Sequence, residues 1–526
     1  MHAIHIKKNI LTLFVFLAML TLSACVATTA TVSSITEVKP GQGLLTLRMT
    51  SNISGSLVSG SRWIGIDVKR IDKKKKTEDE ADEIYTVSKV ATGSMRSAIF
   101  LGALPAGQYK FVKISAGRFY VDIKEELPTF KVAPGKTTYL GTLIDHPEYN
   151  MAFSGALYFA VDPRKDNMLN ILRSEFPKLG HMFSTPLNGW DSKFKVKGPF
   201  VSLNLVKNNT ALINKPVMNK HGEIFAGSML GQILKRNSNG KWSQLDTGSI
   251  HEVISVFPLN DKTLIAGGDA GLFVISTDLG KSWKKLPPLP IRGANFFTGR
   301  DSAGRFYTVT RRENDAILFS STDIYKGNWK KLREFKIEKG WSVPWSAAEV
   351  NLVDDHLFMA LPPHNFHGYN TTTNKWHDSL APFSWTGQVR MLPGGMTYAV
   401  GTAGMLNSLF VSPDYGKTWS ELDTSTRSAN PIFLDPANGY MTHSKAISII
   451  AAQYEQVLHR TEDGGKTWQE MGHLPSKFHN GLFATGKNSP LFMTTSDGSI
   501  YATTDNGKTW QAERMNLLIY NAKKNK

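Results

Sequence analysis

Short runs of alternating hydrophobic and polar residues follow one another from about residue 43 to the end of the chain. Leu44–Met49 and Ile64–Val68 are early examples, and an alternation of period two is typical of strands with one buried face. Pro-Ala-Gly at 105–107 and Ala-Pro-Gly at 133–135 precede similar runs at 110–114 and 137–140. Such turn-forming residues lead into strands, so the pattern predicts an all-β protein.

One segment departs from this alternation and has helical spacing. Its apolar positions are Met168, Leu169, Ile171, Leu172 and Phe176, which repeat at the three-to-four residue interval of a helix face. Asp162-Pro163 offers a cap and a first-turn proline, and Gly180 is a plausible stop. We expect a helix here, followed by a linker over residues 181–197.

From about residue 200 the chain repeats itself. Each unit has a Trp near its end, and the spacing varies between 41 residues (242 to 283) and 49 residues (419 to 468). The seven positions are Trp242, Trp283, Trp329, Trp376, Trp419, Trp468 and Trp510. A period in the forties with four short strands per unit is typical of a β-propeller, and seven units predict seven blades.

Four of the units share an eight-residue segment, at 276–283, 412–419, 461–468 and 503–510, whose third residue is Asp278, Asp414, Asp463 or Asp505. The units that end at Trp242, Trp329 and Trp376 carry degenerate versions. The segment resembles the Asp-box, or BNR, repeat. The resemblance implies a hairpin between the third and fourth strands of a blade, in which the Asp accepts hydrogen bonds from turn amides. We therefore expect the four aspartates to be structural.

The N-terminus carries a targeting pattern. Lys7 and Lys8 precede an apolar run over residues 10–22, which ends in Leu22-Ser23-Ala24-Cys25. This resembles the bacterial lipoprotein signal, and the resemblance implies that the mature chain starts at Cys25 and carries lipid there. Val26 stands where an Asp would indicate inner-membrane retention, so the prediction is a lipid-anchored outer-membrane protein of the bacterial envelope.

These patterns divide the 526 residues into five predicted segments. They are a signal peptide (1–24), a lipidated tether (25–42), a β-sandwich domain (43–160), a helix and linker (161–198) and a seven-bladed propeller (199–526). The turns at 104–109 and 132–136 resemble those of transthyretin-like and carboxypeptidase-regulatory-like sandwiches, which implies a fold and no particular chemistry.

Composition narrows the partners. The formal net charge of +17 favours anionic lipid or an acidic glycan, while no Lys/Arg-rich helix or RNA-binding signature indicates nucleic acid. The single cysteine, Cys25, leaves no disulfide and no catalytic thiol. No zinc spacing, phosphate-binding Gly loop or nucleophile elbow occurs, so we expect neither metal nor cofactor.

A functional site is expected in the loops that follow each fourth strand and feed the next innermost strand, at one mouth of the channel. The predicted binding residues are Trp341, Trp345, Trp385, Arg292, Arg390, Arg427 and His479. The aromatic faces would stack on sugars or hold peptide side chains, and the arginines, with Lys477, would form a cationic mouth for a carboxylate. Blade packing and solvated loop charge are the structural alternatives.

Three functions remain open. Asp-box propellers include sialidases, oligoxyloglucan hydrolases, sortilin-type receptors and a photosystem II assembly factor. A sialidase has six blades, three substrate-binding arginines and a Tyr-Glu pair. Seven repeats are counted here, no Tyr-Glu pair can be assigned, and Pro290–Gly293 has the wrong order for the sialidase motif, so a sialidase-like hydrolase is a minority alternative. Glu252 and Glu349 are the acids to test for a two-carboxylate glycosidase. The leading hypothesis is a non-catalytic module that binds an envelope protein or glycan; the alternatives are an exo-acting glycoside hydrolase and a purely structural module.

Overall fold

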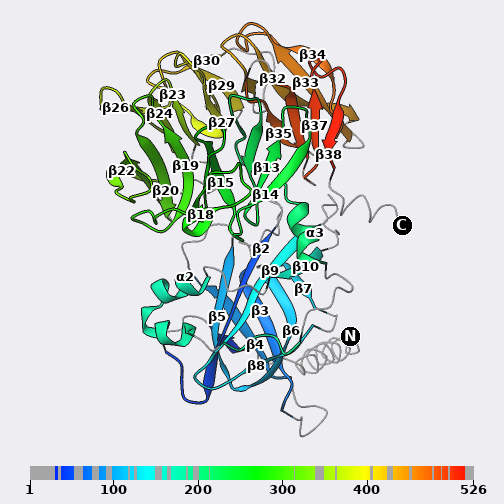
Figure 1. Cartoon of the computed structure of the whole chain (residues 1–526). Coiled ribbons are helices and arrows are strands. Elements are labelled where there is room, and N and C mark those ends of the chain that lie inside the picture. Colours follow the sequence, from blue (N-terminus) through cyan, green and yellow to red (C-terminus); the bar gives the residue numbers. More distant parts are fainter. Residues whose placement is uncertain are drawn as a thin grey trace, which may run out of the picture.

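The computed structural model describes residues 30–32, 37–51, 63–73, 82–90, 97–116, 119–123, 127–147, 157–162, 168–184, 187–192, 201–211, 214–312, 314–337, 349–361, 364–402, 407–422, 431–448, 453–476, 479–486, 489–495 and 498–515. Cys25, Trp341, Trp345, Arg427 and Lys477 lie outside these residues, so their predicted roles stay predictions. The chain forms two parts, a lower N-terminal domain and an upper propeller (Figure 1).

The N-terminal domain is one ten-stranded sheet in the order β10-β9-β2-β5-β4-β3-β6-β7, with β1 beside β4 and β8 beside β6. Its strands are β1 (Ala30–Val32), β2 (Gln42–Ser51), β3 (Gly65–Arg70), β4 (Ile84–Val90), β5 (Ala98–Pro105), β6 (Gly107–Ala116), β7 (Phe119–Asp122), β8 (Phe130–Val132), β9 (Thr137–Pro147) and β10 (Leu157–Asp162). The runs predicted as strands at 44–49, 64–68, 110–114 and 137–140 fall in β2, β3, β6 and β9.

The two halves of this sheet share one hydrophobic core. Leu47 and Phe100 from β2 and β5 pack in the same cluster as Ile66 and Phe111 from β3 and β6. The two halves are continuous because β4 pairs with β3 on one side and β5 on the other. A curled sheet of this kind buries its apolar face against itself.

The predicted helix is present as α2 (Met168–Glu175), but its predicted end is wrong. The helix ends before Pro177, and Gly180 lies inside the following 3₁₀ segment η2 (Pro177–Phe183). Proline disfavours the helical conformation in the residue before it, and Phe176 accordingly has a φ of −126°. The proline therefore overrides the glycine as the stop signal.

Part of the predicted linker belongs to the N-terminal domain. The Trp190 indole donates a hydrogen bond to the Leu140 carbonyl (2.9 Å), and its ring lies 5.7 Å from those of Phe111 and Phe130. Burial of an aromatic ring with a satisfied N–H is favourable, so residues 187–192 are held against the core. The linker predicted over residues 181–197 thus contains a stretch that packs on the N-terminal domain.

The propeller consists of seven antiparallel sheets of four strands each, as predicted. Blades 1 to 3 are β11 (Val217–Met218), β12 (Ile224–Gly227), β13 (Gln232–Arg236), β14 (Trp242–Asp246); β15 (Val253–Pro258), β16 (Leu264–Gly268), β17 (Phe273–Ser276), β18 (Lys284–Lys285); and β19 (Ala294–Arg300), β20 (Phe306–Arg312), β21 (Asp315–Ser321), β22 (Lys330–Lys336). A single 3₁₀ turn, η3 (Asp269–Gly271), joins β16 to β17. Blades 4 and 5 are β23 (Glu349–Val353), β24 (His356–Leu361), β25 (Asn365–Asn370), β26 (Lys375–Leu380); and β27 (Ser384–Met391), β28 (Thr397–Thr402), β29 (Asn407–Ser412), β30 (Ser420–Leu422). Blades 6 and 7 are β31 (Ile432–Phe433), β32 (Gly439–Ser448), β33 (Gln453–Thr461), β34 (Gln469–His473); and β35 (His479–Phe483), β36 (Leu491–Thr495), β37 (Ile500–Thr503), β38 (Gln511–Arg514).

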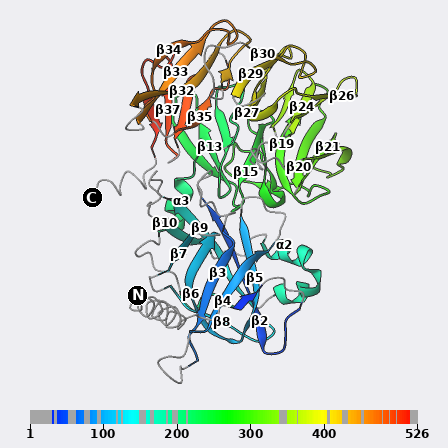
Figure 2. The ribbon, with the colours of Figure 1, turned by 180° about the vertical axis from the view of Figure 1, so that it is seen from behind.

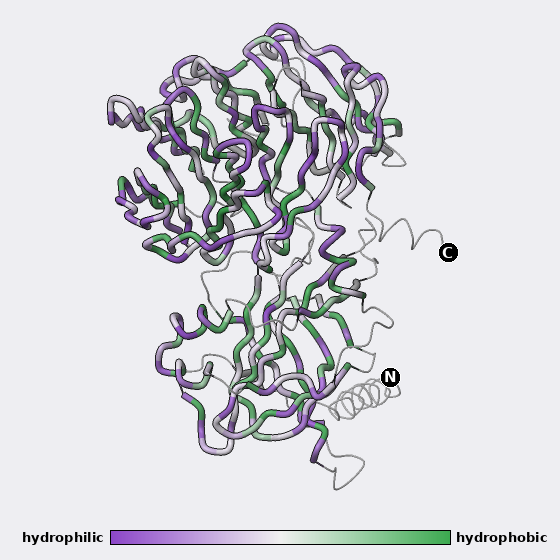
Figure 3. The backbone as a smooth tube through the Cα atoms, in the orientation of Figure 1, coloured by the Kyte–Doolittle hydropathy of each residue, from purple (hydrophilic) through white to green (hydrophobic). Residues whose placement is uncertain are grey.

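The Trp register that predicted the blades marks their outer strands. Each of the seven tryptophans lies within the first two residues of a fourth strand or directly before it. Hydrophobic segments gather along the strands and hydrophilic ones at turns and outer loops (Figure 3). The blades therefore bury apolar faces against one another, which is what holds a propeller together.

A short helix, α3 (Leu203–Asn208), leads from the N-terminal domain into blade 1. Its first turn is capped by the Ser202 hydroxyl, which accepts from the Leu205 amide. Val206 joins a cluster with Ile144 of β9 and with Met229 and Leu230 of blade 1. α2 and α3 lie on opposite sides of the domain's propeller-facing end (Figures 1 and 2), so this end is fixed at two places.

Candidate binding channel

The four Asp-boxes have the same hydrogen-bond pattern. In the first box, the Asp278 carboxylate accepts from the Ser276 hydroxyl (2.7 Å) and from both the amide and hydroxyl of Ser282 (2.9 and 2.6 Å). Asp414, Asp463 and Asp505 each make the equivalent three contacts. Each carboxylate is thus occupied in closing its own turn.

Box hydrogen bonds favour the ionised carboxylate. The pKa of Asp278, Asp463 and Asp505 is lowered to about 2. The main cause in each box is the Ser or Thr four residues after the Asp, whose hydroxyl and then whose amide donate to the carboxylate. The box glycine packs closely against the preceding blade. Gly507 has a φ of +88°, and a Cβ there would lie 2.1 Å from Leu458 of blade 6. The boxes therefore form part of the contacts between neighbouring blades.

The N-terminal domain covers part of the predicted channel mouth. Arg292 donates to the Ser174 hydroxyl (2.6 Å) and to the Asn170 carbonyl (3.3 Å), both in α2. Arg312 at the end of β20 lies 3.6 Å from Glu175. Blade 7 is reached on the same face, where Arg514 donates to the Asn208 carbonyl at the end of α3 (3.1 Å). Contacts of this kind thus extend over blades 1, 2, 3 and 7. Arg292 is therefore engaged within the chain.

His251 lies two residues before β15, near enough to Arg48 of the N-terminal domain and to Arg292 to be affected by their charges. Its side chain is buried, with only 5% of the residue exposed, and neither ring nitrogen has a hydrogen-bond partner among the described residues. Burial, then the charges of Arg48 in β2 and Arg292, hold the pKa of His251 well below its ordinary value of 6.5. The imidazole is consequently neutral at pH 7.

The channel itself gathers charged side chains from separate blades. The first strand of each sheet contacts the first strand of the next blade for blades 2 to 5, as expected for strands that line the axis. Lys215, just before β11 of blade 1, donates to the Asn351 amide oxygen in β23 of blade 4. Glu349 lies two residues before Asn351, and alternate strand residues share a face, so the charges of Glu349 and Lys215 are near enough to interact.

Each group changes the ionisation of its neighbour. Burial raises the pKa of Glu349, and the positive charge of Lys215 opposes this rise. Burial lowers the pKa of Lys215, Glu349 counteracts the effect, and Arg390 adds to it. The three charges therefore form one electrostatic cluster with two cations and one carboxylate.

Arg390 extends this cluster across the axis. Its guanidinium donates to the Ala484 carbonyl (3.3 and 3.4 Å), which joins blade 5 to blade 7. Burial lowers its pKa. Lys215 is exposed, and Glu349 and Arg390 are half-buried, so solvent reaches part of all three side chains.

The second candidate acid has a different setting. Glu252 is 2% exposed, and its carboxylate accepts from the Asn214 amide (3.1 Å). Asn214 also donates to the Val253 carbonyl (2.6 Å), which anchors the segment that carries Lys215. Glu252 thus positions that segment and has almost no surface for a substrate, whereas a glycosidase needs both carboxyl groups at the scissile bond.

The prediction placed several site residues in loops, and this placement is wrong for Glu349, Trp385, Arg390 and His479. All four lie in innermost strands, β23, β27 and β35. For Trp385 and His479 the structure describes only the backbone, so their binding roles stay predictions. Lys215 was not predicted, because it lies before the first repeat and no periodicity marks it.

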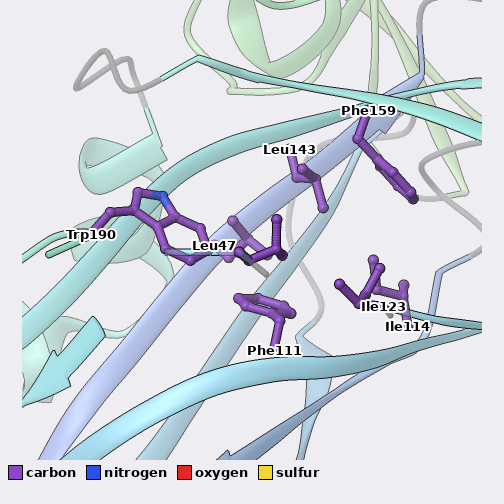
Figure 4. A pocket seen from close by; sticks show the side chains of 8 residues that line it. Leu47, Phe111, Ile114, Ile123, Leu143, Phe159 and Trp190 are labelled. Atoms are coloured by element: carbon purple, nitrogen blue, oxygen red, sulfur yellow. The ribbon is translucent and has the colours of Figure 1, made fainter. Parts of the chain in front are cut away.

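Other features of the described residues carry less chemistry. The N-terminal domain has a small apolar cavity lined by Leu47, Phe111, Ile114, Ile123, Leu127, Leu143, Phe159 and Trp190 (Figure 4). Its free space is about 10 Å³, which is too little for more than one water, and an apolar wall gives water no partner. Among the described residues no group of three or more His, Cys, Asp or Glu could hold a metal ion, and no helix could span a membrane.

Comparisons with known proteins find a partial family match and several similar solved structures. Residues 404–518 match the family model described as Photosynthesis system II assembly factor YCF48. No curated protein is significantly similar in sequence. Three solved structures are similar: YCF48 bound to D1 peptide (15% identity, 56% of this chain, 91% of that chain, TM-score 0.41), YCF48 from Cyanidioschyzon merolae (14%, 56% and 95%, 0.41) and the GH74 xyloglucanase from Xanthomonas campestris (12%, 59% and 55%, 0.43). The C-terminal part of this chain is thus a seven-bladed β-propeller, and its residues 404–518 are similar to a BNR-type propeller family.

Proposed function

We propose that this chain is an envelope-anchored lipoprotein whose propeller is a non-catalytic binding or assembly module for a protein or glycan partner. The observation that carries the proposal is the setting of the two candidate acids. Glu349 interacts electrostatically with Lys215, and Glu252 is 2% exposed and accepts a hydrogen bond from Asn214. Glu252 therefore has almost no surface with which to act on a substrate as the second carboxylate of a glycosidase.

The channel's charge balance favours an anionic group on the partner. Lys215 and Arg390 supply two positive charges and Glu349 one negative charge, so an acidic group that reaches the cluster gains attraction in a partly enclosed site. The match of residues 404–518 to an assembly-factor family supports a protein as the partner. The part of these side chains that solvent reaches is open to that group.

A glycoside hydrolase is the second candidate. Glu349 has a raised pKa and is half-buried, and a raised carboxyl pKa is what a general acid needs. The purified mature chain should be incubated with a panel of envelope and plant glycans, alongside Glu349→Gln. We expect no turnover by either protein; hydrolysis that Glu349→Gln abolishes would replace the binding function with an enzymatic one.

Anchoring through lipid on Cys25 is a separate part of the proposal. It rests on the Leu-Ser-Ala-Cys sequence at 22–25. Cells expressing the chain should be fed labelled palmitate, with Cys25→Ser as the matched control. We expect label and membrane fractionation in the wild type and neither in Cys25→Ser; equal fractionation of both chains would refute the anchor.

A further inference from the structure

The chain enters the N-terminal domain shortly after Cys25. β1 begins at Ala30 and pairs in parallel with residues 85–87 of β4. β3 takes the other edge of β4, and β5 pairs only with residues 89 and 90 of the same edge, so β1 completes the sheet at this place. The tether predicted over residues 25–42 thus contains a strand of the domain, and four residues separate Cys25 from it.

The strand registers show at which end of the domain the chain enters. Ala30 lies beside Tyr85, at the start of β4. The end of β3, the start of β6 and the turn from β5 to β6 lie at the same end, and so does the start of β2, because Gln42 pairs with Pro105. From there β2 and β9 run in parallel towards the propeller, where Ile144 of β9 packs with blade 1. The chain therefore enters at the end opposite to the propeller (Figure 1).

Three turns, at residues 38–41, 105–107 and 133–136, form this distal end of the domain. The Ala106 amide donates to the Gly41 carbonyl (2.9 Å), and the Gly135 amide donates to the Gln42 carbonyl (2.8 Å). Backbone hydrogen bonds thus hold the three turns side by side.

The distal end carries an excess of positive charge among its described residues. The exposed lysines on its turns and on β8 are Lys39, Lys131 and Lys136. Glu37 is an exposed acid at this end, whereas Asp72 and Glu83 of the β3–β4 connection are each paired with Arg70. Lysines near a bilayer are attracted to anionic headgroups.

We propose that the distal end rests on an anionic lipid surface, so that the N-terminal domain holds the propeller away from the membrane. The proposal rests on the proposed lipid anchor at Cys25. The five residue steps from Cys25 to Ala30 span at most about 18 Å, which keeps the distal end close to the bilayer. β2 has ten residues and is about 33 Å long at the rise of a strand, so the propeller begins beyond the reach of the tether. The lysines favour this upright orientation over one in which the molecule lies on its side.

The test uses the lipidated full chain bound to vesicles of phosphatidylethanolamine and phosphatidylglycerol (3:1) that carry an acceptor dye on their headgroups. Cys25 is the only cysteine and is blocked by lipid, so a donor dye labels one introduced cysteine. Pro40→Cys reports on the distal end, and Leu380→Cys and Gln511→Cys report on the outer strands of blades 4 and 7. We expect energy transfer at position 40 to be several times stronger than at 380 and 511. Equal transfer at position 40 and at either propeller position would overturn the proposal.

A second variant tests the role of β1. Alternate strand residues donate to the same neighbour, so Thr31→Pro with Val32→Pro removes a donor whichever way the strand faces. The tether would then extend to residue 37 and span at most about 43 Å, and the preference of the acceptor for position 40 should fall. Ser33→Pro with Ser34→Pro, directly after the strand, is the matched control and should keep the preference. An unchanged preference in the Thr31→Pro/Val32→Pro variant would contradict the fixed, short tether.

The lipid composition separates the remaining outcomes. On vesicles of phosphatidylcholine alone the preference for position 40 should weaken, and an unchanged preference would overturn the role of the lysines. A lipidated chain that binds neither kind of vesicle would refute the anchor itself and this proposal with it. A chain that binds but shows the wrong order of energy transfer would refute the orientation alone.

Discussion

Arg236 of blade 1 and Glu513 of blade 7, 277 positions apart in sequence, form a two-pronged ion pair with N–O distances of 2.8 and 2.6 Å. The Trp242 indole donates to the same carboxylate (2.8 Å), and the Arg236 guanidinium lies over the Phe492 ring. Each blade is built from consecutive strands, so no strand is shared between the first and last blades. Side chains therefore close the ring.

Replacing Glu513 should weaken the contact between blades 1 and 7. The side chains of Arg236 and Glu513 are 11% and 12% exposed, and breaking such a pair leaves a poorly solvated charge, which costs about 3–5 kcal/mol. Glu513→Gln is expected to lower the free energy of unfolding in urea by that order. The exposed pair Lys331–Glu334 supplies the control, because Glu334→Gln should cost less than about 1 kcal/mol. Equal losses would contradict closure by Glu513.

The Asp-boxes should make stability sensitive to acid. The pKa of Asp463 is about 2 in the folded chain and 3.8 ordinarily. A carboxyl with a lowered folded pKa contributes stability that is present above pH 3.8 and is lost as the pH falls towards 2. Asp463→Asn should therefore flatten the dependence of the unfolding midpoint on pH between 4 and 2. Identical slopes for the two proteins would show that the box does not hold its carboxylate ionised.

Protonation of His251 should lower the stability of the folded chain at a higher pH than protonation of the Asp-boxes. Its folded pKa lies well below 6.5, so the stability of the neutral form is present above pH 6.5 and is lost as the pH falls below it. Wild-type protein should lose stability between pH 7 and 5, and His251→Phe should lose less, by thermal unfolding. The expected site of opening is the contact of Arg48 and Arg292 with this residue. A variant with unchanged pH dependence would exclude His251 as the cause.

Box glycines should be more sensitive than other turn glycines. Gly507 and Gly394 have φ values of +88° and +82°, but a Cβ meets Leu458 at Gly507 and nothing within 4 Å at Gly394. Gly394→Ala should cost about 1–2 kcal/mol for the left-handed conformation alone. Gly507→Ala should cost clearly more in urea unfolding, because the clash adds to the strain. Equal costs would indicate that the box does not press on the preceding blade.

The fold could be predicted wherever it repeats. The Trp register gave seven blades because every Trp occupies the same place beside an outer strand, and the Asp-box pattern predicted the hydrogen bonds of Asp278 and its equivalents. The helix end was predicted from Gly180 and was wrong, since Pro177 decides it. Local patterns compete, and sequence alone does not rank them.

The site was predictable only in part, because its chemistry does not repeat. Glu349 and Arg390 were found from their position after a fourth strand, although they lie in strands and not in loops. Lys215 joins them from outside the repeat. The cover over Arg292 depends on how the N-terminal domain docks, and docking between domains leaves no periodic signal in a sequence.

If the channel cluster binds a partner without catalysis, chemical cross-linking of the full chain in native envelopes should capture that partner. Wild type is compared with a Lys215→Met/Arg390→Met variant. Lys281→Met, an exposed lysine in the first Asp-box, is the control. We expect one discrete cross-linked species in the wild type and the control, and its loss in the channel variant. The same cross-linked species at equal yield in all three proteins would contradict the account.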